Sequence, residues 1–422
     1  MLATPSILIS NMKRKILVTI LIVLSVILAA LIGLVVYLTI NQTMVEDIPE
    51  TTASVPETVP ETTEATFTEP EETTAPLPEP EYFTLTFVGD CTLGSNPSKF
   101  SSKTALVKVV GDNYDYPFQN VRSYFENDDF TLINLESVLA DSGTASGSLF
   151  AFRGPESYVN ILTGSSVEAV TLANNHTMDF GTKGYQNTKT VLENAGVTYV
   201  EHDNISLYTT QSGLVIGLYA NAFELTEKGI KKNIQALKDA GAEVIICAYH
   251  WGNEGSYRPT AEQKKFAEYS ISQGAHIIAA HHPHVLQPME TGENSVIFYS
   301  LGNFCFGGNS NPRDKDSVIA QVEIIRDIDG TILVGNVDTI PVSISTVKKG
   351  NDYQPILYQP DTEEFQRAMS KVLGTFTGKD LVVNYDHLKE TTPSGDGETS
   401  DTPQETPKEE TPKPPEAASP EQ

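Results

Sequence analysis

The feature that most restricts the fold of this chain is an uncharged apolar run near its start. Residues 16–40, ILVTILIVLSVILAALIGLVVYLTI, contain no charged side chain. As a helix rising about 1.5 Å per residue, the run would extend roughly 37 Å, enough to cross a ~30 Å hydrocarbon core with some tilt. The alternative, a cleaved signal peptide, has an apolar core of only about 7–15 residues and ends in a small-residue cleavage site. The run therefore predicts an uncleaved transmembrane anchor.

The charges on the two sides of this run predict its orientation. Lys13, Arg14 and Lys15 come directly before it, and residues 41–80 after it contain ten acidic side chains and no Lys or Arg. Positive charge favours the cytoplasmic side. We therefore expect residues 1–15 in the cytoplasm, a single pass through the cell membrane, and an extracellular C-terminal domain.

Two acidic segments flank the part that can fold. Residues 41–80 are a Pro/Thr/Glu tract, and residues 388–422 have a similar composition. Both lack the apolar content that offsets chain entropy, so we expect a disordered stalk and a disordered tail. The tail would also suit a segment held close to a cell-wall matrix. Residues 81–387 remain, long enough for one large core or two small ones, and we treat them as one domain.

Charge and cysteine content exclude some functions. The chain has a net charge of −27, and the two flanking segments and the basic cluster leave −14 for residues 81–387. Such a surface repels phosphate backbones, so no nucleic acid partner is expected. Cys91, Cys247 and Cys305 cannot form a disulfide framework and are most simply buried hydrophobic residues.

The folded part alternates short apolar runs with amphipathic stretches. The runs predict strands at 83–88, 130–135, 167–173, 214–220, 243–249 and 276–280. Helices are expected at 183–194 and 260–273, the second with Thr260 as N-cap and Gln263 three residues later. Such alternation indicates a layered α/β domain. Asp329-Gly330 between 318–326 and 331–337 predicts an antiparallel hairpin, so the sheet should be mixed.

Polar side chains follow five of the predicted strands. They are Asp90, Glu136, the sequence Asn174-Asn175-His176, His250, and the sequence His281-His282-Pro283-His284. In open α/β sheets, ligands bind outside the carboxyl ends of the strands. Oxygen donors mixed with imidazoles suit Mn²⁺, Fe²⁺ or Zn²⁺. The sequence therefore predicts a site for one or two divalent ions.

Each motif taken alone has a structural alternative. Gly89-Asp90 could be a turn, Glu136 a surface acid, and Asn-Asn-His a hydrogen-bonded turn. His282 and His284 could be exposed, but alternate residues of an extended segment point the same way and could reach one ion. Five of the eight histidines fall at strand ends, which favours the metal site.

These motifs occur together in one known family. The strings VGDCTLG, NLES, LANNHTMDFGTKG, YHWGNEGSYRPTAEQ, SQGAHIIAAHHPHVLQPME and IFYSLGNFCF, over residues 83–310, resemble the CapA family. These capsule-synthesis proteins are associated with poly-γ-glutamate and belong to the calcineurin-like metallophosphoesterase superfamily. The resemblance implies a metallophosphatase-like layered sandwich of two mixed β-sheets flanked by helices.

The resemblance also implies roles for individual residues. Asp90 and His284 would bind the first metal, Glu136 would bridge two metals, and Asn175, His250 and His282 would bind the second. His176 would protonate the leaving group. Asp179 would orient His176 or, alternatively, be an acid at a helix start. Two ions would clamp a phosphoryl group and activate water.

Substrate contacts are expected from side chains near these motifs. The candidates are Arg153, Trp251, Glu254, Arg258 and Asn303. A structural ion pair is the alternative for either arginine, and backbone capping is the alternative for Asn303.

Two functions remain open. Asp90 is followed by Cys91 and Thr92 where the superfamily has Asp-x-His, and Glu136 stands where it has Asp. The first function is a metal-dependent, phosphoesterase-like hydrolase in capsule biosynthesis, export or anchoring. The second is a non-catalytic polymer-binding or assembly subunit of a membrane capsule synthase. The expected partners are an anionic capsular polymer or a phosphoester substrate, and capsule-synthase subunits. A domain of net charge −14 would need a local basic patch or bridging cations to bind polyglutamate.

Overall fold

The computed structural model describes residues 79–147 and 150–383. Within these ranges, no helix is long and apolar enough to span a membrane. The anchor predicted at 16–40 lies outside the described residues, as do most of the predicted stalk and tail.

The first sheet has eight strands in the order β16-β15-β14-β1-β2-β5-β6, and β13 also pairs with β1. Its strands are β1 (Glu81–Thr92), β2 (Phe130–Leu135), β5 (Ala169–Thr171), β6 (Thr198–Val200), β13 (Asn303–Phe306), β14 (Asp316–Arg326), β15 (Ile332–Ser343) and β16 (Ile356–Leu357). β1, β2, β5, β6 and β13 run parallel, whereas β14, β15 and β16 pair in antiparallel fashion. The sheet is therefore mixed, as predicted.

The second sheet has six strands in the order β11-β12-β10-β9-β8-β7. Its strands are β7 (Asn204–Thr209), β8 (Val215–Ala222), β9 (Val244–His250), β10 (Ile277–His281), β11 (Met289–Thr291) and β12 (Val296–Phe298). The central four are parallel, and the two edge strands are antiparallel. A separate pair joins β3 (Val138–Leu139) and β4 (Arg153–Gly154).

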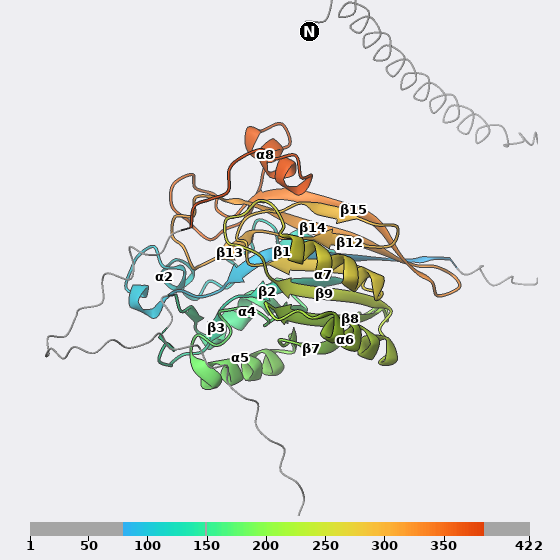
Figure 1. Cartoon of the computed structure of the whole chain (residues 1–422). Coiled ribbons are helices and arrows are strands. Elements are labelled where there is room, and N and C mark those ends of the chain that lie inside the picture. The colour runs from blue at the N-terminus through green and yellow to red at the C-terminus, as the bar shows by residue number, and fades with distance from the viewer. Residues whose placement is uncertain (1–78, 148–149, 384–422) are drawn as a thin grey trace, which may run out of the picture. The chain divides into compact units, whose positions relative to one another are not determined.

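Helices cover the outer faces of the two sheets (Figure 1). The outer helices are α2 (Leu106–Val110), α3 (Arg122–Glu126), α4 (Val159–Thr163), α5 (Gly181–Ala195), α6 (Glu227–Asp239) and α7 (Ala261–Ser272), with short 3-10 turns η1 (Pro97–Lys99) and η2 (Glu156–Tyr158). In contrast, α8 (Glu363–Val372) contributes Ala368 and Val372 to the core between the sheets and contacts β14 and β15. α2, α3, α4 and α5 pack on the first sheet, and α6 and α7 on the second.

The alternation of side chains along β9 shows how the layers are built. Ile246 and Ala248 belong to the core between the two sheets, whereas Ile245, Cys247 and Tyr249 pack under α6 and α7. Successive strand residues point to opposite faces. A strand that is apolar throughout is therefore buried on both sides.

The predicted elements agree with the structure in type and approximate bounds. α7 begins with the expected capping box, in which Gln263 N donates to Thr260 Oγ1 at 3.1 Å and Thr260 N donates to Gln263 Oε1 at 2.9 Å. The coarse fold prediction, two mixed sheets flanked by helices, is confirmed.

The two sheets bring their carboxyl ends to the same place. His281, the last residue of β10, lies with its Nε2 3.1 Å from the carbonyl oxygen of Val88 in β1. The residues at or just beyond the carboxyl ends of β1, β2, β5, β9 and β10 consequently gather at one edge of the sandwich.

Candidate functional site

Asp90 is positioned by a close approach of two backbones. The strand predicted to end at residue 88 continues to Thr92, because β13 extends the pairing beyond an irregularity after Phe87. A Cβ on Gly89 would lie 2.2 Å from the carbonyl oxygen of Gly302, so only glycine fits there. Asp90 N donates to that same oxygen at 2.8 Å.

The Asp90 carboxylate is fully buried and hydrogen-bonded on both oxygens. Asn134 Nδ2 donates to Oδ1 at 2.8 Å, and His284 Nδ1 lies 3.0 Å from Oδ2. Burial opposes ionisation, but the hydrogen bond and charge of His284 outweigh it and place the pKa of Asp90 below its ordinary value. Asp90 is therefore an anion at neutral pH.

Glu136 sits at the centre of the site without a hydrogen bond. It is 0% exposed, and neither carboxylate oxygen has a hydrogen-bond partner among the described residues. The Nε2 atoms of His250, His284 and His176 lie 3.7, 3.8 and 4.0 Å from its Oε1. Burial, reinforced by the charge of Asp90, raises the pKa of Glu136 well above its ordinary value.

The His-Pro-His segment reaches the site by a route that differs from the prediction. An extended segment was expected, but His282 has a φ of 95° and His284 a φ of 55°. Pro283 cannot donate to a strand ladder, so the chain leaves the sheet after His281. Positive φ values are rare for residues with a side chain and concentrate at functional sites.

Both histidines nevertheless face the site. Burial lowers the pKa of His282 to about 4, and the positive charge of His284 adds to this. For His284, burial acts in the same direction, but the charges of Glu136 and Asp90 raise its pKa to about 10. The Asp90–His284 pair is thus ionic in the absence of a cation.

His250 connects the second sheet to the turn after β5. Its Nε2 lies 2.8 Å from Asn175 Oδ1, and its ring centroid lies 4.8 Å from that of His282. Burial, with the charge of His282, lowers the pKa of His250 well below its ordinary value. A neutral imidazole is the form that binds metal ions.

His176 is held by a carboxylate on the side away from Glu136. Its Nδ1 lies 2.8 Å from Asp179 Oδ2, which also accepts from Phe152 N at 2.7 Å. The contact expected from an orienting Asp179 is therefore present. α5 begins at Gly181, and its first turn holds no acid, so the structure does not favour the helix-start alternative.

The roles of two asparagines of the site were not predicted from the sequence, although Asn174 belongs to the predicted Asn-Asn-His motif. Asn134 Nδ2 bonds to Asp90, and its Oδ1 accepts from Asn174 Nδ2 at 3.0 Å. Asn174 Oδ1 in turn accepts from His176 N at 3.0 Å. Spacing offered a signal for Asn134, because it stands two residues before Glu136 and thus on the same side of the strand.

A partly exposed aromatic was missed as well. Phe223 is 52% exposed, and its ring meets those of His282 and His250 edge-on at 4.8 and 5.6 Å. No sequence signal distinguished it from other residues at the end of β8.

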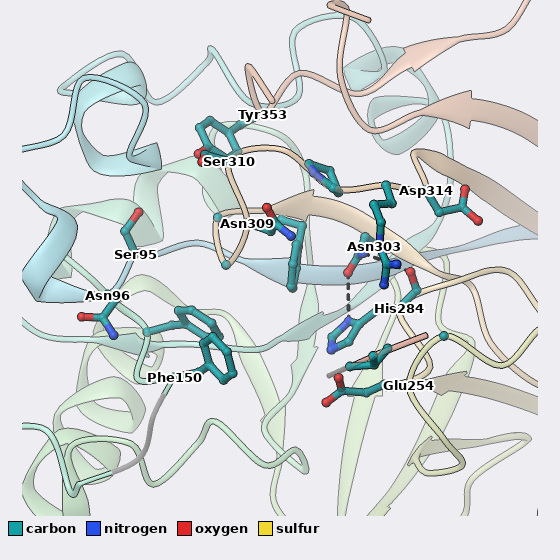
Figure 2. Close-up of a pocket in the computed structure, with 18 of the residues that line it drawn as sticks. Ser95, Asn96, Phe150, Glu254, His284, Asn303, Asn309, Ser310, Asp314 and Tyr353 are labelled. Atoms are coloured by element: carbon teal, nitrogen blue, oxygen red, sulfur yellow. Dashed lines mark hydrogen bonds between the residues drawn. The ribbon is translucent and has the colours of Figure 1, made fainter. Parts of the chain in front are cut away.

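The structure places two of the five residues expected to contact substrate at one pocket and the other three elsewhere. Asn303 and Glu254 line a pocket of about 780 Å³ that also includes His176 and His284 (Figure 2). Asn303 Oδ1 lies 2.9 Å from His284 Nδ1, and its Nδ2 donates to the carbonyl of His284 at 3.1 Å. Asn303 thus orients a site histidine.

The other three lie away from that pocket. Arg258 pairs with Asp380 at 2.9 Å, which is the structural ion pair kept as an alternative. Trp251 is buried and donates from its indole to the Tyr299 carbonyl at 3.1 Å. The guanidinium of Arg153 lies over the rings of Phe100 and Phe180. The expected substrate contacts of these three residues find no support, because packing and ion pairs occupy their side chains.

The donors present fit a divalent cation. Asp90, Glu136 and His284 place ligand atoms within 4.8 Å of one another, and so do Glu254, His282 and His284. A buried carboxylate without hydrogen bonds costs free energy unless a cation or a proton satisfies it. Carboxylate and imidazole together suit Mn²⁺, Fe²⁺ or Zn²⁺. Glu136 is therefore the observation that argues for a metal.

Comparison with known proteins identifies the family. Residues 84–308 match the family described as bacterial capsule synthesis protein PGA_cap. The chain belongs to this family. It is 28% identical over 341 residues to the capsule biosynthesis protein CapA of Bacillus anthracis, covering 73% of this chain and 78% of that protein. It is also 28% identical over 324 residues to the PGA biosynthesis protein CapA of Bacillus subtilis strain 168, covering 70% and 82%.

Solved structures give weaker likenesses to this PGA_cap protein. The NAD nucleotidase of Haemophilus influenzae aligns with a TM-score of 0.37 and 11% identity, covering 74% of this chain and 59% of that one. A purple acid phosphatase from yellow lupin seeds aligns with a TM-score of 0.28 and 9% identity, covering 61% and 53%. These TM-scores are too low to establish a shared fold. The family assignment rests on sequence, and the description of the site rests on its own geometry.

Proposed function

We propose that this protein is a membrane-anchored, extracellular hydrolase that depends on a divalent metal and acts in capsule biosynthesis, export or anchoring. The observation that carries the proposal is the unpartnered Glu136 carboxylate among three imidazoles, buried at the edge where both sheets end. A bound divalent cation would satisfy it and would polarise a phosphoryl or related group.

The side chains suit three tasks in such a reaction. Asp90, Glu136, Asn175, His250, His282 and His284 would hold one or two ions, as the resemblance implies. His176 would donate a proton to the leaving group from Nε2, which lies on the Glu136 side of its ring. Asp179 would keep the ring in place by accepting from Nδ1.

The pocket suits a polymer that carries carboxylates. Lys99 and Arg313 both line it, at positions far apart in the chain, among several amide and hydroxyl groups. Because Glu254 and Asp314 line the same pocket, these two cations balance its acids, and a bound divalent cation would add the positive charge needed to hold an anion. The relatives are named for capsule and PGA biosynthesis. We therefore propose poly-γ-glutamate, or a phosphoester intermediate of its assembly, as the ligand.

The anchor remains a proposal from the sequence. The uncharged run 16–40 after Lys13-Arg14-Lys15 supports a single-pass protein with its domain outside the cell. Cysteine labelling of intact cells at residues introduced before and after the run would test it, because only the residue after the run should react with a reagent that cannot enter.

Metal content and turnover test the enzymatic proposal. The purified full-length protein should contain Mn, Fe or Zn by elemental analysis and should hydrolyse a generic phosphodiester when Mn²⁺ is added. A protein without bound metal and without turnover would contradict the proposal.

The non-catalytic alternative is separated by the capsule phenotype. The Cys91-Thr92 sequence after Asp90 departs from the superfamily and favours an assembly role. Cells carrying D90A or H282A in a normally folded protein should lose capsule if catalysis is needed. Undiminished capsule would favour a polymer-binding or assembly subunit.

A further inference from the structure

Glu254 faces the two histidines of the His-Pro-His segment from a separate loop. Its carboxylate and one ring nitrogen of each of His282 and His284 lie within 4.8 Å of one another. Figure 2 shows Glu254 and His284 next to each other at the pocket wall. This group shares only His284 with the one formed by Asp90 and Glu136.

The backbone fixes Glu254 opposite the histidines. Trp251 N donates to the His281 carbonyl at 3.1 Å, and Gly255 N donates to the Pro283 carbonyl at 2.8 Å. The loop is thus tied to the His-Pro-His segment on both sides of Glu254. These bonds fix the backbone position from which the Glu254 side chain extends.

A third segment holds the same loop from the other side. Leu381 N donates to the Gly255 carbonyl at 2.9 Å, and Arg258 pairs with Asp380. A Cβ on Gly255, whose φ is 75°, would lie 2.7 Å from the Leu381 carbonyl oxygen. The loop is therefore clamped between the site and the segment after α8, which is how rigid ligand loops are built.

A buried nitrogen of His282, a member of the same group, has no hydrogen-bond partner among the described residues. His282 is 8% exposed, and its Nδ1 makes no hydrogen bond among the described residues. Buried polar atoms are almost always satisfied, so each exception needs an explanation such as an ion. This observation is independent of the Glu136 carboxylate, which lies in the other group.

We propose that Glu254 is a ligand of a divalent cation, acting with His282 and with His284 at the border of the two groups. Two imidazoles and one carboxylate form a donor set known from zinc and non-haem iron sites. The inference rests on the metal dependence proposed above. It assigns Glu254 to metal binding, whereas the sequence predicted a substrate contact for this residue. The alternative is that Glu254 is only an ionic partner of the histidines.

Metal binding by the full-length protein distinguishes these roles. Titration calorimetry with Zn²⁺ and with Mn²⁺, together with elemental analysis, would compare wild type with E254Q, E254H and the matched control E268Q, an exposed glutamate on α7. If Glu254 is a ligand, E254Q should bind the metal at least about tenfold more weakly than wild type, or should hold one ion fewer. E254H, which restores a donor, should bind more tightly than E254Q, and E268Q should match wild type.

The visible spectrum of bound Co²⁺ gives a readout that an ionic partner would not move. Loss of a carboxylate ligand changes the coordination of the ion, so E254Q should show altered absorption bands and E268Q should not. Equal affinity, stoichiometry and spectrum in wild type and E254Q would overturn the inference while leaving the proposed function intact. A wild-type protein that binds no ion would overturn the proposed function itself.

Discussion

The ring of His284 is held through one nitrogen by two residues of neighbouring strands, Asp90 and Asn303. His284 Nδ1 lies 3.0 Å from Asp90 Oδ2 and 2.9 Å from Asn303 Oδ1. Asp90 and Asn303 are partners in the parallel pairing of β1 with β13. The register of these two strands therefore fixes the direction of a side chain whose own backbone lies outside any strand.

Removal of the Asn303 amide should weaken metal binding. N303A leaves His284 without one of its two acceptors, so we expect affinity for Mn²⁺ to fall about tenfold, the effect typical of losing a group that orients a ligand. Titration calorimetry measures it. N309A, at another pocket-lining asparagine, should bind as wild type does, and an N303A protein with unchanged affinity would contradict the expectation.

His176 and Asp179 should affect turnover more than metal binding. H176N removes the proposed acid and should lower kcat by about 10²–10⁴-fold, and D179N should lower it through loss of ring orientation. Metal content should remain that of wild type in both. M178A alters an exposed side chain between them and serves as the control. A parallel loss of metal in H176N would show that His176 is instead a ligand.

The strand ends were readable from the sequence because an apolar run stops there abruptly. Asp90, Glu136, His250 and His282 each follow such a run, and parallel strands bring their carboxyl ends together. The chemistry at the edge follows from local sequence and one rule of sheet topology. The resemblance to the CapA family then assigned these residues to a first or a second metal ion.

The contacts that could not be predicted from the sequence are those between residues far apart in the chain. Arg258 pairs with Asp380, and nothing near either residue indicates that the two meet. Asn134 stands within an apolar strand and reads as an interruption of it until Asp90 is placed on the adjacent strand. The positive φ values of His282 and His284 accompany backbone hydrogen bonds from another loop to their segment, and local propensity does not contain these bonds.

The pocket cations should govern binding of a polyanion. Loss of one exposed charge contact costs roughly 0.2–1 kcal/mol. K99A and R313A should therefore each weaken poly-γ-glutamate binding by up to about fivefold, and added salt should narrow the difference. K108A, an exposed lysine on α2 that does not line the pocket, is the control. Fluorescence anisotropy with labelled polymer measures the effect, and equal losses in all three variants would mean that binding is non-specific.

The interface between the sheets should dominate stability. Phe87 of β1 is fully buried and packs on Phe298 of β12, with ring centroids 6.4 Å apart. F87A should lower the free energy of unfolding by about 3–5 kcal/mol because it opens a cavity between the layers. Y82A, on the same strand but 63% exposed, should change it little. Urea unfolding followed by circular dichroism tests both, and a small effect of F87A would mean that the sheets close over the gap.

Two acids outside the candidate site should make stability depend on pH. Burial raises the pKa of Asp128 to about 7 from an ordinary 3.8, and that of Glu168 to about 7 from 4.5. Between about pH 4 and pH 7, the folded protein therefore keeps protons that the unfolded chain has released. The contribution of these two acids to the free energy of unfolding must therefore fall as pH rises through this window and level off above it.

The double variant D128N/E168Q isolates this contribution. It cannot release these protons, so its free energy of unfolding should fall less than that of wild type between pH 5 and pH 8, as measured by urea titration. Contributions from the site histidines cancel in the comparison because both proteins contain them. A control at two exposed acids, E262Q/D338N, should follow wild type. If D128N/E168Q also follows wild type, the two carboxyls are already ionised at pH 5, and the burial around β2 and β5 does not hold their protons.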